Sequence, residues 1–346
     1  MKTYGVVLIG CGSMGAAHLN AISVHPQARL VGTVDLSEEK ARQFAKRYHA
    51  ESWNTDYRVY LSNENVDIVI IATYPASHLE LTQVCLSAGK HVLCEKPMAA
   101  TLREAAEMVR LGSSARAKLL IGHILRHNTT YQFVRSLIRR GVIGSPIAMR
   151  MSQIKNPATT WDSHLALLRE VSPIVDCGVH YVDVMRWFTG AEVLSVSGFG
   201  QRLDADIPPS AYNYGMITLK LSDGSVGFYE AGWGHSLPTE TLKEFIGPQG
   251  RIRITYQSHR PEPKLGNLVE IAYSDGRTEV VNIPFDAKPT GLQFGYLLRM
   301  IEDNLDPRPL LDDFYRALEV TVLGDKAIRE NKAIPCLQRI PEIVNL

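Results

Sequence analysis

The 346-residue sequence lacks an excess of charge of either sign and lacks any long hydrophobic run. Lysine and arginine total 37 against 36 aspartates and glutamates, which leaves a formal net charge of +1. Such a balance gives no electrostatic case for a nucleic-acid or anionic-membrane partner. The best apolar run, residues 68–72, has the size of a strand and is far short of the ~18 apolar residues of a membrane span. We therefore expect neither nucleic-acid binding nor membrane insertion.

Cysteine is also scarce. The five cysteines are odd in number, widely scattered and without a Cys-x-x-Cys pair, which argues against a disulfide framework and against a zinc site. The first residues lack the long apolar region and small-residue cleavage site of a secretory signal. With 45% apolar and 21% charged residues the composition is typical of a globular protein, which we expect in the reducing cytoplasm. The length predicts two domains.

The first third of the sequence alternates between apolar runs of strand length and helical patterns. The expected strands cover residues 6–9, 30–34, 67–72, 91–94 and 118–122, and the expected helices cover 16–24, 37–48, 77–88 and 102–111. Strands separated by helices of this length pair in parallel through right-handed crossovers. The pattern predicts an N-terminal Rossmann domain, with a doubly wound parallel sheet, over residues 1–122.

Beyond residue 122 the pattern changes from α/β to α+β. Helices are expected at 131–140, 174–188 and 312–329. Between them lie strands with period-two alternation, and Asp-Gly pairs at 223–224 and 275–276 separate alternating runs, which is a strong hairpin signal. Residues 123–346 are therefore predicted to form a second domain with a large, mostly antiparallel open sheet.

A glycine-rich turn directly follows the first predicted strand. Gly10, Gly12 and Gly15 form a Gly-x-Gly-x-x-Gly pattern before a helix, and Asp35 ends the second strand 20 residues later. This context is typical of dinucleotide binding, because the turn and the helix N-terminus present amide groups to a diphosphate. Asp35 can accept hydrogen bonds from ribose hydroxyls and would repel a 2′-phosphate, which favours NAD over NADP. The alternative is a glycine-rich turn that binds nothing.

Two further segments follow the carboxyl ends of parallel strands, where open α/β sheets bind ligands. One is residues 73–78, and the other is Cys94-Glu95-Lys96-Pro97. Pro97 biases Lys96 toward an extended backbone, so that the amine can reach a substrate hydroxyl or carbonyl. The alternative is a solvated lysine before a proline that opens a helix.

An acidic residue and a histidine lie four positions apart in the second domain. Asp176 and His180 share one face if the predicted helix is continuous. A carboxylate can orient a histidine and raise its basicity, which suits a general base for an alcohol proton. The alternative is an ordinary helical ion pair beside the core.

The order of these motifs resembles the Gfo/Idh/MocA family of oxidoreductases. The matching segments are residues 10–15, Asp35, residues 73–78, residues 95–97 and residues 176–183. The resemblance implies a nicotinamide-binding first domain and a second domain whose open sheet often forms an oligomer interface. It also implies a secondary alcohol of a sugar, inositol or similar polyol as the substrate.

The resemblance assigns roles to individual residues. The family's catalytic lysine falls on Lys96, and its Asp/His pair falls on Asp176 and His180. By analogy His180 takes the hydroxyl proton, Asp176 orients His180, and Lys96 stabilises the developing oxyanion or relays the proton. The predicted cofactor-binding residues are Gly10, Gly12, Ser13, Met14, Gly15, Asp35, Thr73, Tyr74, His78, Glu95 and Lys96. Cys11 and Tyr74 depart from the residues usual in the family without removing a functional group.

Three residues are candidates for substrate binding. Arg126 follows the last strand of the first domain, while Trp161 and His164 lie in an expected loop before residue 176. Trp161 resembles a family position near the nicotinamide, although an apolar plug is an equal alternative. No metal site is predicted, because His164, His180 and Asp176 lack further ligands at the short spacings of metal sites.

Three functions remain open from the sequence. The first is an NAD-dependent dehydrogenase of a sugar, inositol or related polyol, working as a homodimer or homotetramer. The second is a redox-neutral enzyme that cleaves glycosides by oxidation and elimination with a bound NAD, as some relatives do. The third is a catalytically silent protein that senses NAD or sugar, against which the joint presence of Lys96, Asp176 and His180 argues.

Overall fold

The computed structural model describes residues 2–261, 266–284 and 288–336. By their contacts these residues form two compact units. The first comprises residues 2–124 and 288–315, and the second comprises residues 125–284 and 316–336. From the sequence, residues 123–346 were predicted to form one domain; residues 337–346 lie outside the described residues. In the structure, residues 288–315 belong to the first unit instead.

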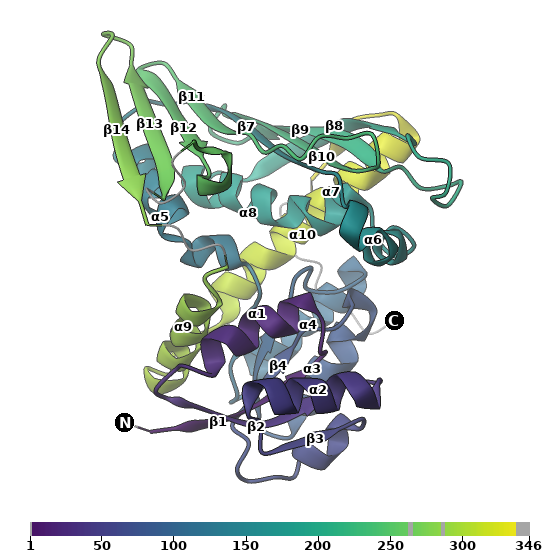
Figure 1. Ribbon diagram of the computed structural model, residues 1–346. Coiled ribbons are helices and arrows are strands. Elements are labelled where there is room, and N and C mark those ends of the chain that lie inside the picture. The colour runs from purple at the N-terminus through teal and green to yellow at the C-terminus, as the bar shows by residue number, and fades with distance from the viewer. Residues whose placement is uncertain (1, 262–265, 285–287, 337–346) are drawn as a thin grey trace. The chain divides into compact units, whose positions relative to one another are not determined.

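The first unit is built on a six-stranded sheet in which every pairing is parallel (Figure 1). Its strands are β1 (Tyr4–Ile9), β2 (Ala28–Val34), β3 (Ser52–Asn54), β4 (Ile68–Ile71), β5 (His91–Cys94) and β6 (Leu119–Ile121). Their order is β3-β2-β1-β4-β5-β6, so the direction of strand addition reverses between β1 and β4. Ligands of such sheets bind at the carboxyl ends of the strands beside this reversal.

Helices connect and cover these strands. They are α1 (Ser13–Ile22), α2 (Glu38–Tyr48), α3 (His78–Ser87), α4 (Leu102–Ser114) and α9 (Thr290–Glu302). Helix α4 begins with a reciprocal cap, in which Thr101 accepts from the backbone of Glu104 while the Glu104 side chain accepts from the backbone of Thr101. Helix α9 packs on α1, and the Thr290 hydroxyl donates to the Ala17 carbonyl at 3.0 Å. These contacts explain why residues from the far end of the sequence belong to the first unit.

The second unit is built on a nine-stranded sheet in the order β14-β13-β12-β11-β7-β10-β9-β8-β15. Its strands are β7 (Ala148–Lys155), β8 (Val193–Gln201), β9 (Tyr214–Leu221), β10 (Val226–Trp233), β11 (Lys243–Gly247), β12 (Gly250–Thr255), β13 (Asn267–Tyr273), β14 (Thr278–Ile283) and β15 (Ile334–Pro335). Among these described strands, all pairings are antiparallel except that of β7 with β10. Both Asp-Gly pairs lie in hairpins as predicted, between β9 and β10 and between β13 and β14.

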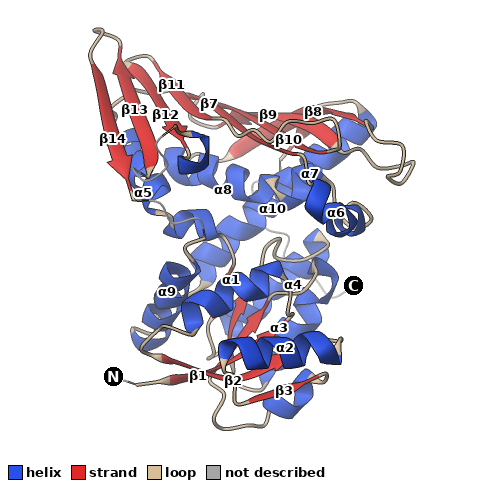
Figure 2. Cartoon of the chain, viewed as in Figure 1, coloured by secondary structure: helices blue, strands red, loops and turns tan. Residues whose placement is uncertain are grey.

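Helices lie along one face of this sheet (Figure 2). They are α5 (Thr129–Arg139), α6 (Trp161–Leu167), α7 (Pro173–Asp176), α8 (Gly178–Thr189) and α10 (Arg308–Glu330), whose first residues belong to the first unit. The sheet also carries exposed apolar side chains, among them Phe199 and Phe228, which are 74% and 39% exposed. The predicted fold class, a parallel Rossmann sheet followed by an α+β domain with a mostly antiparallel sheet, is confirmed.

Two local predictions were wrong. The helix predicted at 174–188 is broken at Cys177 into α7 and α8. Residues 161–164, predicted to lie in a loop, form most of α6. Helix α10 is followed by β15, which pairs with β8.

Candidate functional site

The glycine-rich turn joins β1 to α1 and has the shape that a diphosphate requires. Gly10 has φ of +101°, and a Cβ there would lie 2.6 Å from the Ala72 carbonyl oxygen. A Cβ on Gly15 would overlap the Gly10 carbonyl oxygen. At Gly12, in contrast, no atom of the described residues lies within 4 Å of where a Cβ would be. The turn is therefore packed on its inner side and open at Gly12.

Helix α1 begins at this open side without a side-chain cap. Gly12 is the N-cap and accepts from the amide of Ala16 at 2.9 Å, while Ser13 is exposed and Met14 is half-buried. Amide groups at an uncapped helix start are donors that an anion can use, and the helix dipole favours negative charge there. The turn therefore fits the diphosphate of a dinucleotide on its own geometry.

Asp35 holds the turn from the end of β2. Its Oδ2 accepts from the amide of Cys11 at 2.9 Å, and its Oδ1 accepts from the amide of Ser37 at 2.9 Å. The carboxylate is half-buried and retains lone pairs for ribose hydroxyls. Burial, followed by the charge of Asp35, raises the pKa of the Cys11 thiol to about 12, so this cysteine packs as a thiol.

His78 ties together the loops after β4 and β5. Its Nδ1 lies 3.0 Å from the Pro97 carbonyl oxygen and its Nε2 lies 3.2 Å from the Thr73 carbonyl oxygen. The ring is fully buried, and this burial lowers the pKa of His78. The sequence grouped His78 with the cofactor-binding residues; here both ring nitrogens face chain carbonyls, so the ring positions the two loops. Tyr74, by contrast, is 50% exposed.

Lys96 follows β5 closely and is half-buried, with a cis peptide bond to Pro97. Its neighbour Glu95 is buried, and the Oε1 of Glu95 lies 2.7 Å from the Nε2 of His18. The Oε2 of Glu95 accepts from the amide of Lys96 at 3.1 Å. Burial alone would raise the pKa of Glu95, but His18 and the charge of Lys96 outweigh it and hold this pKa below its usual range. The sequence did not single out His18, because a lone histidine within a predicted helix carries no chemical signal.

Asp176 and His180 lie on either side of the break between α7 and α8. The amide of His180 donates to the Cys177 carbonyl at 3.2 Å, so this turn is tighter than the continuous α-helix assumed from the sequence. Gly178 is closely packed at the break, because a Cβ there would lie 3.0 Å from the Tyr229 Cε1 atom. Asp176 is buried and His180 is half-buried. Cys177 contacts the Asp176 Oδ2 through its sulfur at 3.5 Å.

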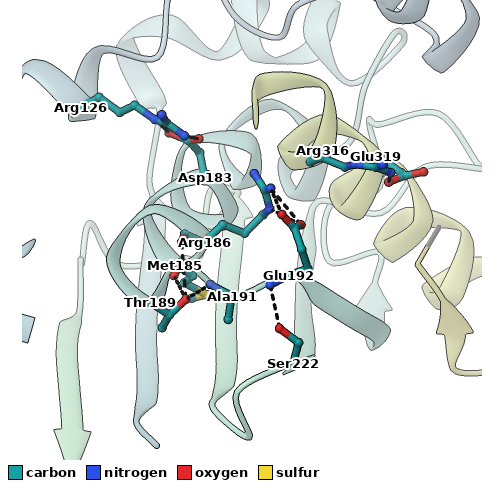
Figure 3. A network of polar contacts seen from close by, with 10 residues as sticks. All are labelled: Arg126, Asp183, Met185, Arg186, Thr189, Ala191, Glu192, Ser222, Arg316 and Glu319. Atoms are coloured by element: carbon teal, nitrogen blue, oxygen red, sulfur yellow. Dashed lines mark hydrogen bonds and ion pairs between the residues drawn. The ribbon is translucent and has the colours of Figure 1, made fainter. Parts of the chain in front are cut away.

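Arg126, a predicted substrate-binding residue, pairs with Asp183 of α8 (Figure 3). The Nε and Nη2 atoms of Arg126 donate to the two carboxylate oxygens of Asp183 at 2.9 and 2.6 Å. Both side chains are buried. Figure 3 also shows Arg186, one turn away on α8, in contact with Glu192. The pairing gives Arg126 a structural task, and its contact with substrate stays a prediction.

Trp161 and His164, the other predicted substrate residues, gather with residues of β10 and its neighbours. The Trp161 indole donates to Asp206 at 2.7 Å, and its ring centroid lies 4.3 Å from that of His235. His164 packs edge-on against Trp233 at 5.0 Å, and burial lowers the pKa of His164. Trp161 and His164 thus belong to aromatic and polar contacts around β10, and their contact with substrate stays a prediction.

Asp204, Asp206 and His235 bring one possible ligand atom each to within 4.8 Å of one another. The sequence did not indicate this grouping, because His235 is distant in sequence from Asp204 and Asp206 and the fold brings it to them. Asp206 is already engaged by Trp161, and Asp204 accepts from Asn213 at 2.6 Å. Both acidic side chains therefore have a hydrogen-bond donor within the protein.

The fold and the turn define a class: a protein with a dinucleotide-binding Rossmann unit. Residues 4–123 match the oxidoreductase family with an NAD-binding Rossmann fold, and residues 131–253 match the GFO/IDH/MocA C-terminal domain. Because these matches cover more than half of the sequence, the chain belongs to the Gfo/Idh/MocA oxidoreductase family. The sequence-based predictions of the family and of an NAD-binding Rossmann unit are confirmed.

Several named proteins and solved structures are similar to the chain. D-apiose dehydrogenase of Paraburkholderia graminis is 28% identical over 260 residues, covering 74% of this chain and 68% of that protein. The scyllo-inositol 2-dehydrogenase (NAD(+)) of Bacillus subtilis is 27% identical over 265 residues, covering 73% of this chain and 74% of that protein. An oxidoreductase from Agrobacterium radiobacter, solved with NAD+, L-tartaric acid and magnesium, superposes with a TM-score of 0.81 at 20% identity, covering 96% and 98% of the two chains.

Among the helices that the structure describes, none is long and apolar enough to cross a membrane.

Proposed function

We propose that the protein is an NAD-dependent dehydrogenase that oxidises a secondary alcohol of a sugar, inositol or related polyol. The observation that carries the proposal is the sheet edge of the first unit. The glycine-rich turn follows β1 and Lys96 follows β5, and only β4 separates these two strands. A cationic side chain is thus set near a turn built for a dinucleotide. The named activities of the similar sugar and inositol dehydrogenases support the same reaction class.

The residues of the turn would hold the cofactor. Gly10 and Gly15 shape it, while Gly12 and the amides of Ser13 and Met14 would face the diphosphate. Asp35 would accept from the ribose hydroxyls, and its negative charge disfavours the 2′-phosphate of NADP. When bound, NAD supplies a hydride acceptor at the nicotinamide ring.

Three side chains would act on the substrate. His180 accepts the proton of the hydroxyl that is oxidised, and Asp176 orients the His180 ring and stabilises its charged form. Lys96 stabilises the negative charge that develops on the substrate oxygen. The surrounding contacts support these roles, since Glu95 holds the backbone of Lys96 and the tight turn at Cys177 fixes the spacing of Asp176 and His180.

We also propose that the protein works as a homodimer or homotetramer in the cytoplasm. The exposed Phe199 and Phe228 on strands of the second unit support an oligomer that uses its sheet. The five cysteines are all buried thiols, which supports a reducing compartment.

The experiment that tests the function is a screen for NADH formation. NAD or NADP is incubated with the protein and with inositols, aldoses, glycosides or other polyols, and the keto forms are screened with NADH. We expect turnover with at least one polyol and a preference for NAD. Absence of any turnover would remove the dehydrogenase proposal, and turnover with NADP alone would remove the argument from Asp35. Lys46→Ala, an exposed position on α2, serves as a control for variants of Lys96.

A further inference from the structure

A buried contact links the cofactor-binding helix to the segment that carries Lys96. His18 lies in α1, the helix that starts at the glycine-rich turn, and Glu95 follows β5. Their Nε2 and Oε1 atoms are 2.7 Å apart, and the side chains are 1% and 5% exposed. The contact therefore joins two segments that are far apart in sequence.

Glu95 also contacts Lys96. Its other carboxylate oxygen accepts from the amide of Lys96 at 3.1 Å, so both oxygens are bound to the chain. The charge of Lys96 is among the interactions that hold the pKa of Glu95 low, so the carboxylate and the ammonium also attract each other. Glu95 thus fixes both the backbone of Lys96 and the electrostatic surroundings of its amine.

The ring of His18 has Glu95 as its anchor. Within the part of the chain that the structure describes, the Nδ1 of His18 is buried and has no hydrogen-bond partner. Loss of Glu95 therefore leaves the His18 ring without this anchor, and loss of His18 leaves Glu95 held only through its Oε2. A buried histidine–carboxylate contact is a weak source of stability, since an apolar pair of similar volume often serves as well. The contact instead fixes the position of the Lys96 segment relative to α1.

We propose that His18 and Glu95 are positioning residues for Lys96, coupling the start of α1 to the place and charge of the lysine amine. The proposal rests on the proposed function, in which Lys96 acts on the substrate. It differs from the cofactor contact that the sequence predicted for Glu95, because both carboxylate oxygens are engaged by the chain itself.

The test compares four variants and one control variant with the wild-type protein. His18→Leu removes the donor, Glu95→Gln removes the charge, and the double variant removes both. His18→Gln returns a side-chain N–H near the position of Nε2 and should restore much of the function. His91→Leu is the matched control, because His91 lies at the other end of β5, where its Nδ1 accepts from the amide of Lys118 at 2.9 Å.

Two readouts separate this proposal from the proposed function. The first is kcat and KM with the best polyol: misplacement of a reacting group can cost up to about a hundredfold in rate, so kcat should fall while KM changes little. The second needs no substrate. The protein is treated with limiting acetic anhydride, and acetylation of Lys96 is measured by mass spectrometry. Loss of the Glu95 charge in Glu95→Gln leaves more of the amine neutral, and loss of the His18 hydrogen bond in His18→Leu loosens the carboxylate that holds the Lys96 segment. Lys96 should therefore react several-fold faster in both variants.

The expected result is a lower kcat and faster acetylation in His18→Leu, Glu95→Gln and the double variant to a similar extent, with His18→Gln and His91→Leu near wild type. Wild-type acetylation rates in His18→Leu and Glu95→Gln would overturn the positioning role, whether or not the protein turns over a polyol. So would an unchanged kcat in an active enzyme. If the wild type shows no turnover but the acetylation rates change as expected, the proposed function fails and the positioning of Lys96 stands.

Discussion

Each unit carries a buried charged contact close to its proposed catalytic residues, and the two contacts are built differently. In the first unit, His18 and Glu95 meet through one pair of atoms at 2.7 Å, and Glu95 bonds directly to the backbone of Lys96. In the second unit, Arg126 and Asp183 meet through two parallel bonds at 2.9 and 2.6 Å, and Asp183 lies on α8 as His180 does. The first contact reaches the reactive residue, while the second fixes the helix that carries one.

The difference follows from the side chains. An arginine is charged at any working pH, and its planar fork matches a carboxylate in two bonds, so the pair with Asp183 is a rigid clamp. A histidine contact is single and depends on protonation. We therefore expect changes in the second unit's pair to act on stability, and changes in the first unit's pair to act on turnover.

The largest expected effect on stability is in the clamp. Asp183→Asn leaves the buried Arg126 without the charge of its Asp183 partner, and breaking a buried pair costs about 3–5 kcal/mol of unfolding free energy. Asp312→Asn is the control, because its pair with Arg308 is 37% and 48% exposed and such pairs are worth under about 1 kcal/mol. Denaturant unfolding measures both variants, and equal losses would contradict the clamp.

The largest expected effect on turnover is at Lys96. In Lys96→Ala, kcat should fall by about 10²–10³-fold, the range for loss of one group that stabilises a developing oxyanion. NAD affinity and unfolding free energy should stay near wild type. Steady-state kinetics and calorimetric titration with NAD measure these quantities, with Lys46→Ala as the control. Unchanged turnover would remove Lys96 from the mechanism.

A smaller effect tests the break between α7 and α8. Gly178→Ala places a Cβ 3.0 Å from Tyr229 and 3.3 Å from Thr321, and overpacking of this kind costs about 1–3 kcal/mol. Because the break sets the spacing of Asp176 and His180, kcat should fall as well. Gly295→Ala in α9 is the control: no atom of the described chain lies within 4 Å of its Cβ, so it should gain about 0.5–1 kcal/mol. Thermal unfolding and kinetics of both variants provide the comparison.

The smallest expected effect is on the stability of the protein at acid pH. The folded protein holds the pKa of Glu95 below its ordinary value of 4.5, so the stabilisation is present above that value and is lost as the pH falls through the lower folded value. Wild-type protein should therefore lose stability relative to Glu95→Gln in this acid range. The loss amounts to about 1.4 kcal/mol for each tenfold difference between the acid dissociation constants of the folded and unfolded states. Unfolding of both proteins as a function of pH measures it, and parallel curves would contradict the ionised, buried carboxylate.

The first unit could be predicted from the sequence nearly strand by strand. Strands β1 and β4 are apolar runs that are buried throughout, and the turn chemistry is local, with Gly10 to Gly15 in one stretch. The short and largely exposed β3 was not predicted. The hairpins of the second unit could also be predicted from the sequence, because Asp-Gly is a local signal. The place of α9 in the first unit could not be predicted from the sequence, because it depends on packing against α1.

The candidate site likewise has parts that could be predicted from the sequence and parts that could not. The positions of the glycine-rich turn and of Lys96 at nearby strand ends follow from the order of motifs. The break at Cys177 was not predicted, because the apolar pattern of residues 174–188 runs across it without a local helix-breaking signal, and the close packing of Gly178 against Tyr229 of β10 joins residues distant in sequence. The contacts of His18 with Glu95 and of Arg126 with Asp183 join residues 77 and 57 positions apart, beyond the reach of any spacing rule.

The measurement that tests the central claim most directly is the stoichiometry of NADH and product with the best substrate of the screen. A dehydrogenase that uses Lys96, Asp176 and His180 forms one NADH for each oxidised polyol, and Lys96→Ala lowers the rates of both together. Aglycone released from a glycoside without net NADH would contradict the account and identify a redox-neutral cleavage instead.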